Sequence, residues 1–156
     1  MKEIEKILLQ YKPLINKAIA KSIPREFKGK ELERIAGKPA YAYDEHSLTK
    51  SIATPIWDLL DRGGKRLRPA LTLLVIEAFG RNPREYLDFA AISELVHNGT
   101  LMVDDIEDNS DFRRGKQCIH KTYGNDIAIN AGNAMYFLPL KIIMQSRLPE
   151  KTKNAL

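Results

Sequence analysis

Four carboxylate side chains lie within five residues, in the segment Asp104-Asp105-Ile106-Glu107-Asp108. Because so many negative charges repel one another, some oppositely charged group must offset them. A pattern of apolar residues at helical spacing precedes the segment, and a continuing helix would place Asp104 and Asp108 one turn apart on one face. Mg²⁺ usually binds one or two carboxylates and takes water and substrate phosphate oxygens as its other ligands. The spacing therefore predicts a magnesium site at Asp104 and Asp108.

Residues on both sides of the acidic segment extend this pattern. His97 and Thr100 precede Asp104 by seven and four residues, so they share its helix face. Arg113 and Arg114 follow, and a guanidinium group matches phosphate oxygens with two parallel hydrogen bonds. An acidic run at a helix end is, however, more often a solvated face to which nearby arginines pair. By itself the stretch leaves both interpretations open.

A second stretch, RGGKRLRP at residues 62–69, has the character of a phosphate-binding turn. Its two glycines let the backbone approach an anion closely. Lys65, Arg66 and Arg68 supply positive charge, and Pro69 suits the first position of the following helix. Without a partner motif it would equally be a basic turn.

Taken together, these segments resemble the trans-prenyltransferase family, the isoprenyl diphosphate synthases. The resemblance covers about residues 50–145. The motifs DDIEDNS and RRG are most similar to those of geranylgeranyl diphosphate synthases. It implies an all-α fold, the N-terminal half of an isoprenoid-synthase helical bundle. The matching segments are GGKRLRP at 63–69, LVHNGTLMVDDIED at 95–108, RRG at 113–115, HKTYG at 120–124 and INAGNAMYF at 129–137.

The resemblance implies a head-to-tail condensation. Diphosphate leaves an allylic diphosphate, and the double bond of isopentenyl diphosphate attacks the resulting cation. By the family pattern Asp104 and Asp108 bind Mg²⁺, the implied cofactor. Asp105 belongs to the same catalytic motif with a less defined role, because its side chain leaves the helix in another direction. Arg113 matches the residue that contacts the allylic diphosphate.

The resemblance also implies a pocket for isopentenyl diphosphate, in which Gly64 contributes its backbone and Lys65, Arg68, His97 and Arg114 contribute side chains. For His97 the competing interpretation is an ordinary histidine on a helix with its hydrogen bonds satisfied. The presence of both motifs favours anion binding.

Product length in this family is set by bulky side chains below the allylic site. The corresponding residues are Gly99 and Thr100, five and four positions before Asp104, and neither is aromatic. We therefore expect a product of twenty carbons, or in the range from fifteen carbons to longer chains. Gly99→Phe is expected to shorten it.

The apolar spacing predicts one domain over residues 1–156, with six or so helices and no strands. A weakly patterned stretch, residues 24–46, is expected to be a surface loop with at most a short helix near 31–36. The predicted helices are 2–22 with a kink at Pro13, 47–61 with Ser47 as its N-cap, a buried helix 69–79, 83–109, a short stretch 118–123, and 126–146 with a bend at Pro139.

The composition bounds the class of protein. The 156 residues are 44% hydrophobic and 29% charged, which is typical of one soluble domain with a real core. The net charge of +5 suits an anionic small substrate, and no nucleic-acid-binding motif accompanies it. A single cysteine, Cys118, fits a reducing cytoplasm, and no uninterrupted apolar run predicts a transmembrane segment.

The second half of the family pattern is missing. After Asp126 the sequence holds one acidic residue, Glu150, so no second aspartate-rich motif is present. We expect a half-subunit completed by a second chain, assembled as a heterotetramer of two plus two. A truncated piece of a longer chain is the alternative. A non-catalytic regulatory or scaffolding subunit of a prenyltransferase complex is the rival from another class, and a free-standing helical binding module ranks last.

Overall fold

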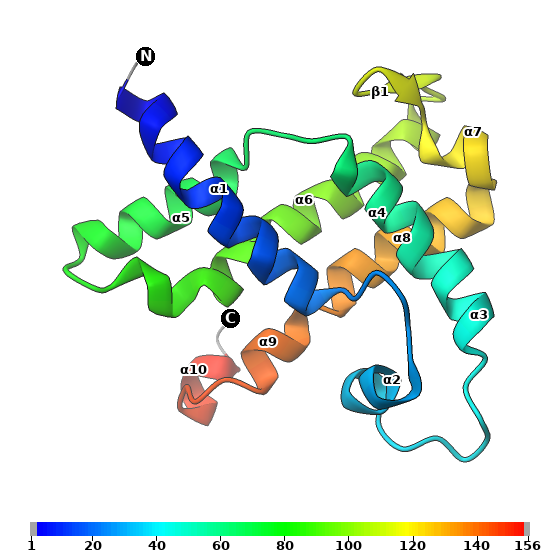
Figure 1. Cartoon of the computed structure of the whole chain (residues 1–156), viewed down its shortest axis with the longest axis horizontal. Helices are drawn as coiled ribbons and strands as arrows, with labels where there is room; N and C mark the ends of the chain where they lie inside the picture. The colour runs from blue at the N-terminus through cyan, green and yellow to red at the C-terminus, as the bar shows by residue number, and fades with distance from the viewer. Residues whose placement is uncertain (1–2, 155–156) are drawn as a thin grey trace. The chain divides into compact units, whose positions relative to one another are not determined.

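The structure, a computed structural model, describes residues 3–154, so the outermost residues of the predicted domain 1–156 lie outside it. Over this range the elements are helices apart from one hairpin of two two-residue strands, which confirms the all-α prediction (Figure 1). The chain forms two compact units. The first unit comprises the chain up to Ser22, Lys65–Val96 and the chain from Pro139 onward, and the second unit comprises Ile23–Gly64 and His97–Leu138.

In the first unit, the long helix α1 contacts α5. Ile15, Ile19 and Leu73 are fully buried there, and the Tyr11 hydroxyl donates to the Glu77 carboxylate at 3.3 Å. The predicted helix at 2–22 is confirmed with Pro13 inside it. The elements are α1 (Glu3–Ser22), α5 (Leu67–Ala78), the 3₁₀ helix η2 (Pro83–Tyr86), the first half of α6 (Leu87–Glu107), α9 (Leu140–Met144) and α10 (Glu150–Lys153).

One face of α5 is exposed, although the sequence predicts a helix buried all round. Residues four apart form this stripe, so they lie along one side of the helix. Phe79 is 82% exposed, and the described residues leave this face of α5 largely uncovered. The opposite face packs against α1. The stripe consists of Leu67, Leu71, Val75 and Phe79, whereas Pro69, Ala70 and Leu73 are buried.

In the second unit, α8 packs against η1, α4 and α7. The predicted loop at 24–46 contains one short helix, as expected. The predicted loop after α6 forms a small antiparallel hairpin, in which Arg113 lies opposite Lys116. The elements are α2 (Gly29–Ala36), α3 (Glu45–Leu48), the π-helical segment η1 (Thr49–Ala53), α4 (Thr54–Asp61), the second half of α6, β1 (Phe112–Arg113), β2 (Lys116–Gln117), α7 (Ile119–Tyr123) and α8 (Asn125–Phe137).

The N-cap predicted at Ser47 is wrong. The helix begins at Glu45, and the carboxylate of Asp44 accepts the backbone N–H of Ser47 at 3.0 Å. An acidic N-cap satisfies an otherwise unpaired amide of the first turn. Ser47 therefore lies inside the helix, where its hydroxyl donates to Asp44 at 2.6 Å.

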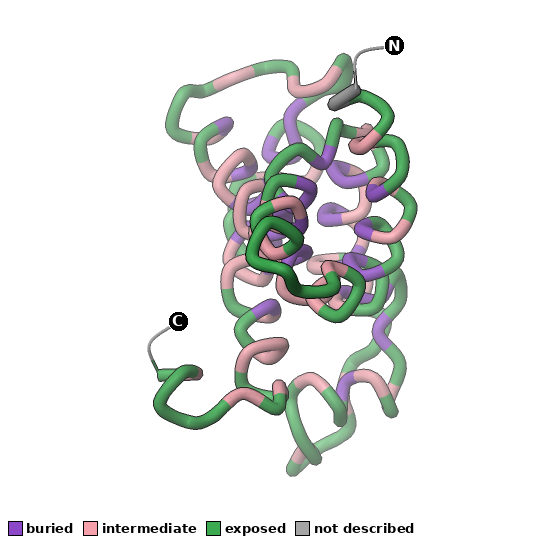
Figure 2. The backbone as a smooth tube through the Cα atoms, turned by 90° about the vertical axis from the view of Figure 1, so that its left-hand side faces the viewer, coloured by how far each residue is buried: buried purple, intermediate pink, exposed green. Residues whose placement is uncertain are grey.

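The apolar stretch Asn125–Met144 is long and apolar enough to cross a membrane by length and composition, a test that core helices also pass. The structure interrupts it at the position of the predicted bend, since α8 ends at Phe137 and α9 begins at Leu140, on either side of Pro139. One side of α8 is buried through Ala128, Ala131, Gly132 and Met135, while Ile129 and Phe137 are exposed. Beyond Pro139 every described residue is intermediate or exposed, and the tube next to the C-terminal end is pink and green in Figure 2.

The helices α6 and α8 cross closely at two glycines. A Cβ atom added to Gly99 would lie 2.9 Å from the carbonyl oxygen of Gly132, 2.9 Å from the Tyr136 ring and 3.2 Å from the Cβ of Met135. A Cβ added to Gly132 would lie 3.3 Å from the Gly99 carbonyl oxygen. Only a residue without a side chain fits at Gly99 unless the helices separate.

Gly99→Ala should therefore destabilise the protein, by about 1–3 kcal/mol of unfolding free energy, because the added methyl group meets backbone. A helical glycine without such a contact would instead gain about 0.5–1 kcal/mol on the same change. Urea unfolding followed by circular dichroism measures the difference, with Thr100→Ala on the adjacent position as the control. An unchanged or increased unfolding midpoint for Gly99→Ala would contradict the close crossing.

Candidate functional site

The three aspartates of the acidic motif lie on two different sides of the helix α6. Asp104 and Asp108 are exposed, whereas Asp105 is 1% exposed. The backbone N–H of Asp108 donates to the Asp104 carbonyl at 2.8 Å, so helical geometry continues through Asp108. Among the described residues no hydrogen bond or salt bridge engages the carboxylate of Asp104 or Asp108. The two side chains predicted to bind metal are thus one turn apart and open to solvent.

The buried carboxylate of Asp105 is neutralised by Arg113. The Nε atom of Arg113 lies 2.9 Å from one carboxylate oxygen of Asp105 and 3.1 Å from the other. This hydrogen bonding raises the pKa of the Arg113 guanidinium. Asp105 also hydrogen-bonds the thiol of Cys118. Asp105 therefore anchors the chain that follows α6, and Arg113 offsets part of the charge of the acidic run.

Arg114 is held by backbone carbonyl groups. Its guanidinium donates to the carbonyl of Gly63 at 2.6 Å, to that of Leu59 at 3.3 Å and to the side-chain oxygen of Asn98 at 3.0 Å. Asn98 is fully buried, and the backbone of Arg114 is left-handed with φ 52°. Arg114 thus fixes the end of α4 against α6 and the hairpin.

Sequence reasoning missed a third arginine of this region, Arg62. Its side chain is 2% exposed and donates to the carbonyls of Arg113 at 3.1 Å and Gln117 at 2.7 Å, while its Nε contacts Asp58 at 3.2 Å. It therefore positions the hairpin that carries the double arginine. The available signal was its place directly before the two glycines of the basic stretch.

The basic turn contains two kinds of cation. Lys65 and Arg68 are exposed in the first unit, as a substrate contact would require. Arg66 is 6% exposed and forms an ion pair with Glu94 at 2.8 Å. The interpretation of all three as available charge is therefore wrong for Arg66, because a buried carboxylate neutralises it. Gly64, next to Lys65, has φ 143° and is exposed.

His97 and Thr100 lie on the face of α6 that carries Asp104. Both are partly buried, and the Thr100 hydroxyl donates to the His97 carbonyl at 2.7 Å. These residues belong to the second unit, whereas Lys65 and Arg68 belong to the first. A joint pocket for isopentenyl diphosphate therefore stays a prediction.

The carboxylates of Asp104 and Asp108 fit a magnesium site in which the protein supplies only some of the ligands. The described residues contain no group of three or more His, Cys, Asp or Glu side chains able to hold a metal. Two exposed carboxylates one turn apart match the mode in which Mg²⁺ keeps several waters and takes substrate phosphate oxygens. The site residues of this chain would supply two ligands, and diphosphate and water would supply the rest.

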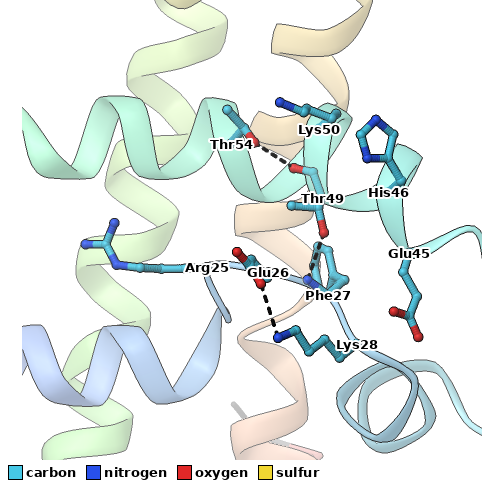
Figure 3. A pocket seen from close by; sticks show the side chains of 9 residues that line it. All are labelled: Arg25, Glu26, Phe27, Lys28, Glu45, His46, Thr49, Lys50 and Thr54. Atoms are coloured by element: carbon cyan, nitrogen blue, oxygen red, sulfur yellow. Dashed lines mark hydrogen bonds and ion pairs between the residues drawn. The ribbon is translucent and has the colours of Figure 1, made fainter.

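A separate pocket of about 520 Å³ lies in the second unit, and none of its lining residues is a predicted site residue (Figure 3). Its side chains are mostly exposed, and the backbone N–H of Phe27 donates to the Thr49 hydroxyl at 2.9 Å within it. It carries no part of the predicted chemistry. The lining residues are Arg25, Glu26, Phe27, Lys28, Glu45, His46, Thr49, Lys50 and Thr54.

Comparison with known proteins identifies the family. The sequence profile described as polyprenyl synthetase matches residues 49–155, and the chain therefore belongs to this family. The geranylgeranyl diphosphate synthase of Methanosarcina mazei is 48% identical over 85 residues, which are 54% of this chain and 26% of that protein. The farnesyl diphosphate synthase of Geobacillus stearothermophilus is 36% identical over 99 residues, 60% of this chain and 33% of that protein.

Solved structures agree in fold. The geranylgeranyl pyrophosphate synthetase of Pyrococcus horikoshii matches with a TM-score of 0.75 at 26% identity, over 99% of this chain and 42% of that chain. That of the archaeon Geoglobus acetivorans matches with a TM-score of 0.64 at 29% identity, over 91% and 42%. The chain thus spans about a quarter to a third of the curated relatives above and somewhat under half of these solved chains.

The thiol of Cys118 should be nearly inert in the folded protein. Burial, with the hydrogen bond and charge of Asp105, raises its pKa to about 11, so at pH 8 almost all of it is the protonated thiol. Reaction with a disulfide reagent at pH 8 should be slower than in urea-unfolded protein by at least about a hundredfold, since the reactive thiolate is scarce and shielded. Equal rates in the two states would show that Asp105 and Cys118 do not pack as described.

Proposed function

We propose that the chain is the N-terminal part of a magnesium-dependent prenyltransferase that condenses isopentenyl diphosphate with an allylic diphosphate. The observation that carries this proposal is the division of the acidic motif, which leaves Asp104 and Asp108 exposed and unpaired while Asp105 is neutralised by Arg113. A solvated acidic face serving stability alone would not require one member to be buried in an ion pair. Membership of the polyprenyl synthetase family supports the same activity.

In this proposal each described residue has a definite task. Asp104 and Asp108 present carboxylate oxygens to Mg²⁺, which when bound would stabilise the charge of the departing diphosphate. Lys65 and Arg68 offer exposed cations to the diphosphate of isopentenyl diphosphate. His97 lies on the same helix face as Asp104 and would donate to the same anion.

The reaction then balances without a redox partner. The allylic carbon–oxygen bond breaks and inorganic diphosphate leaves with the electron pair. The double bond of isopentenyl diphosphate forms the new carbon–carbon bond, and a proton leaves the product. The allylic cation needs an apolar, water-free surrounding, because water would otherwise trap it.

Arg113 and Arg114 take a second role beside substrate contact. Both guanidinium groups hold protein partners, so in the absence of substrate they fix the hairpin and the end of α4. Contact of Arg113 with the allylic diphosphate would use the edge of the guanidinium that Asp105 does not occupy. Arg113 would thereby join the neutralised carboxylate to the substrate.

We further propose that additional polypeptide completes the enzyme, as a second chain in a two-plus-two assembly. Two exposed carboxylates cannot by themselves supply a second metal-binding face. The relatives above are longer than this chain, and α8 exposes Ile129 and Phe137 as an assembly surface would. Native mass spectrometry of the chain purified from its source cells tests this; a lone monomer or homodimer would overturn the two-chain arrangement.

Asp104→Asn and Asp108→Asn should each lower prenyl transfer by the assembled protein by at least about a hundredfold, because each removes a charge that holds the metal and diphosphate. The unfolding midpoint should stay the same or rise, since like-charge repulsion on α6 falls. Glu107→Gln is the matched control, being exposed on the same turn with the same change in charge. Unchanged turnover in the aspartate variants would favour the non-catalytic regulatory or scaffolding role instead.

Thr100→Phe should shorten the product from twenty carbons, because Thr100 is one turn below Asp104 on the same face. Gly99→Phe, the variant that the sequence suggests, would also drive a ring into α8. Thr100→Phe is therefore the cleaner test of chain-length control. Product chromatography after reaction with labelled isopentenyl diphosphate measures it, with Thr100→Val as the size-matched control. An unchanged product distribution would remove Thr100 from this role.

A further inference from the structure

The first unit contains a buried polar network at the basic turn. The Nε of Arg66 donates to the side-chain oxygen of Asn16 on α1 at 2.9 Å, and its Nη1 donates to the carboxylate of Glu94 on α6 at 2.8 Å. The side chains of Arg66 and Glu94 are 6% and 5% exposed. One guanidinium thus joins three separate segments of the chain.

The backbone of Arg66 is as constrained as its side chain. Its φ of 54° lies in the left-handed region, which residues other than glycine rarely adopt. Its carbonyl accepts the N–H of Ala70 at 3.1 Å, the hydrogen bond that opens α5. A disfavoured conformation of this kind persists only where the surroundings fix it, and the fork of Arg66 between Asn16 and Glu94 supplies that constraint.

This conformation sets where the neighbouring cations lie. Lys65 immediately precedes Arg66, and Arg68 lies in the first turn of α5, for which Arg66 is the N-cap residue. Both are exposed, so neither has a buried contact that would orient it. The position of each relative to the other therefore depends on the backbone conformation of the residue between them, Arg66.

We infer that Arg66 and Glu94 are positioning residues, whose buried ion pair holds Lys65 and Arg68 in the arrangement that binds diphosphate. This inference rests on the proposed function. A buried ion pair is a poor source of stability, because desolvation offsets the attraction between the charges, so a role in fixing one conformation accounts better for its presence. Neither residue contacts the anion in this assignment.

The test uses the full chain titrated with inorganic diphosphate in a calorimeter. Lys65→Ala should weaken binding about tenfold, since it removes a charged hydrogen bond to the anion. Glu94→Gln and the apolar double variant Arg66→Met with Glu94→Leu should weaken it at least about threefold, because the turn loses its constraint. The double variant should keep a melting temperature near that of the wild type, since apolar residues of similar volume replace a buried ion pair.

Matched controls come from an exposed ion pair in the same unit, Lys21 with Asp88. Asp88→Asn makes the same change in charge as Glu94→Gln, and the double variant Lys21→Met with Asp88→Leu makes the same changes as the buried double variant. Both controls should leave the affinity unchanged. In NMR spectra recorded without diphosphate, the backbone amide resonances of residues 63–68 should shift in the double variant and stay unchanged in the two controls. This readout reports the conformation of the turn and does not depend on ligand.

The outcomes separate the inference from the function on which it rests. If Lys65→Ala weakens binding but the double variant binds like the wild type, the positioning role is overturned and the diphosphate site stands. If Lys65→Ala binds as the wild type does, diphosphate does not bind at the basic turn, and both assignments fall. Loss of affinity in the double variant with shifted turn resonances and retained melting temperature would support the inference.

Discussion

The acidic end of α6 can exist because one of its carboxylates is neutralised inside the protein. Asp105 is buried against Arg113 and Cys118, which leaves Asp104 and Asp108 facing solvent. Helical geometry makes the division unavoidable, since Asp105 leaves the helix about 100° from Asp104. Arg113, which lowers the repulsion by pairing with Asp105, also fixes the hairpin after the helix. The solvent-facing aspartates and the packed side of α6 therefore depend on the same ion pair.

More of the arginine side chains have a structural role than the sequence suggests. Arg62, Arg66 and Arg114 each join segments far apart in the chain through fork-like hydrogen bonding to carbonyls or carboxylates. The planar guanidinium suits this because it presents several donors in fixed directions. Lys65 and Arg68 remain exposed at the basic turn, and in our assignment the buried Arg66 positions them.

The apolar residues that remain exposed have a clear arrangement within each unit. In the first unit a stripe four residues apart runs along α5 and ends at Phe79, and in the second unit α8 exposes Ile129 and Phe137. The buried side of α8 is packed as closely as backbone allows at Gly132. The exposed sides are thus surfaces that the described residues leave uncovered, in a chain that matches only part of its longer relatives.

The sequence by itself determined the helical class, the positions of most helices and the shared face of His97, Thr100 and Asp104, because these follow from local spacing along a helix. It also pointed to the family through motifs whose order is fixed. Only the tertiary structure decided that Asp105 and Arg66 face inward and that Gly99 touches α8. Those outcomes depend on partners far away in sequence, fifty residues for Arg66 with Asn16, and spacing along one helix carries no information about them.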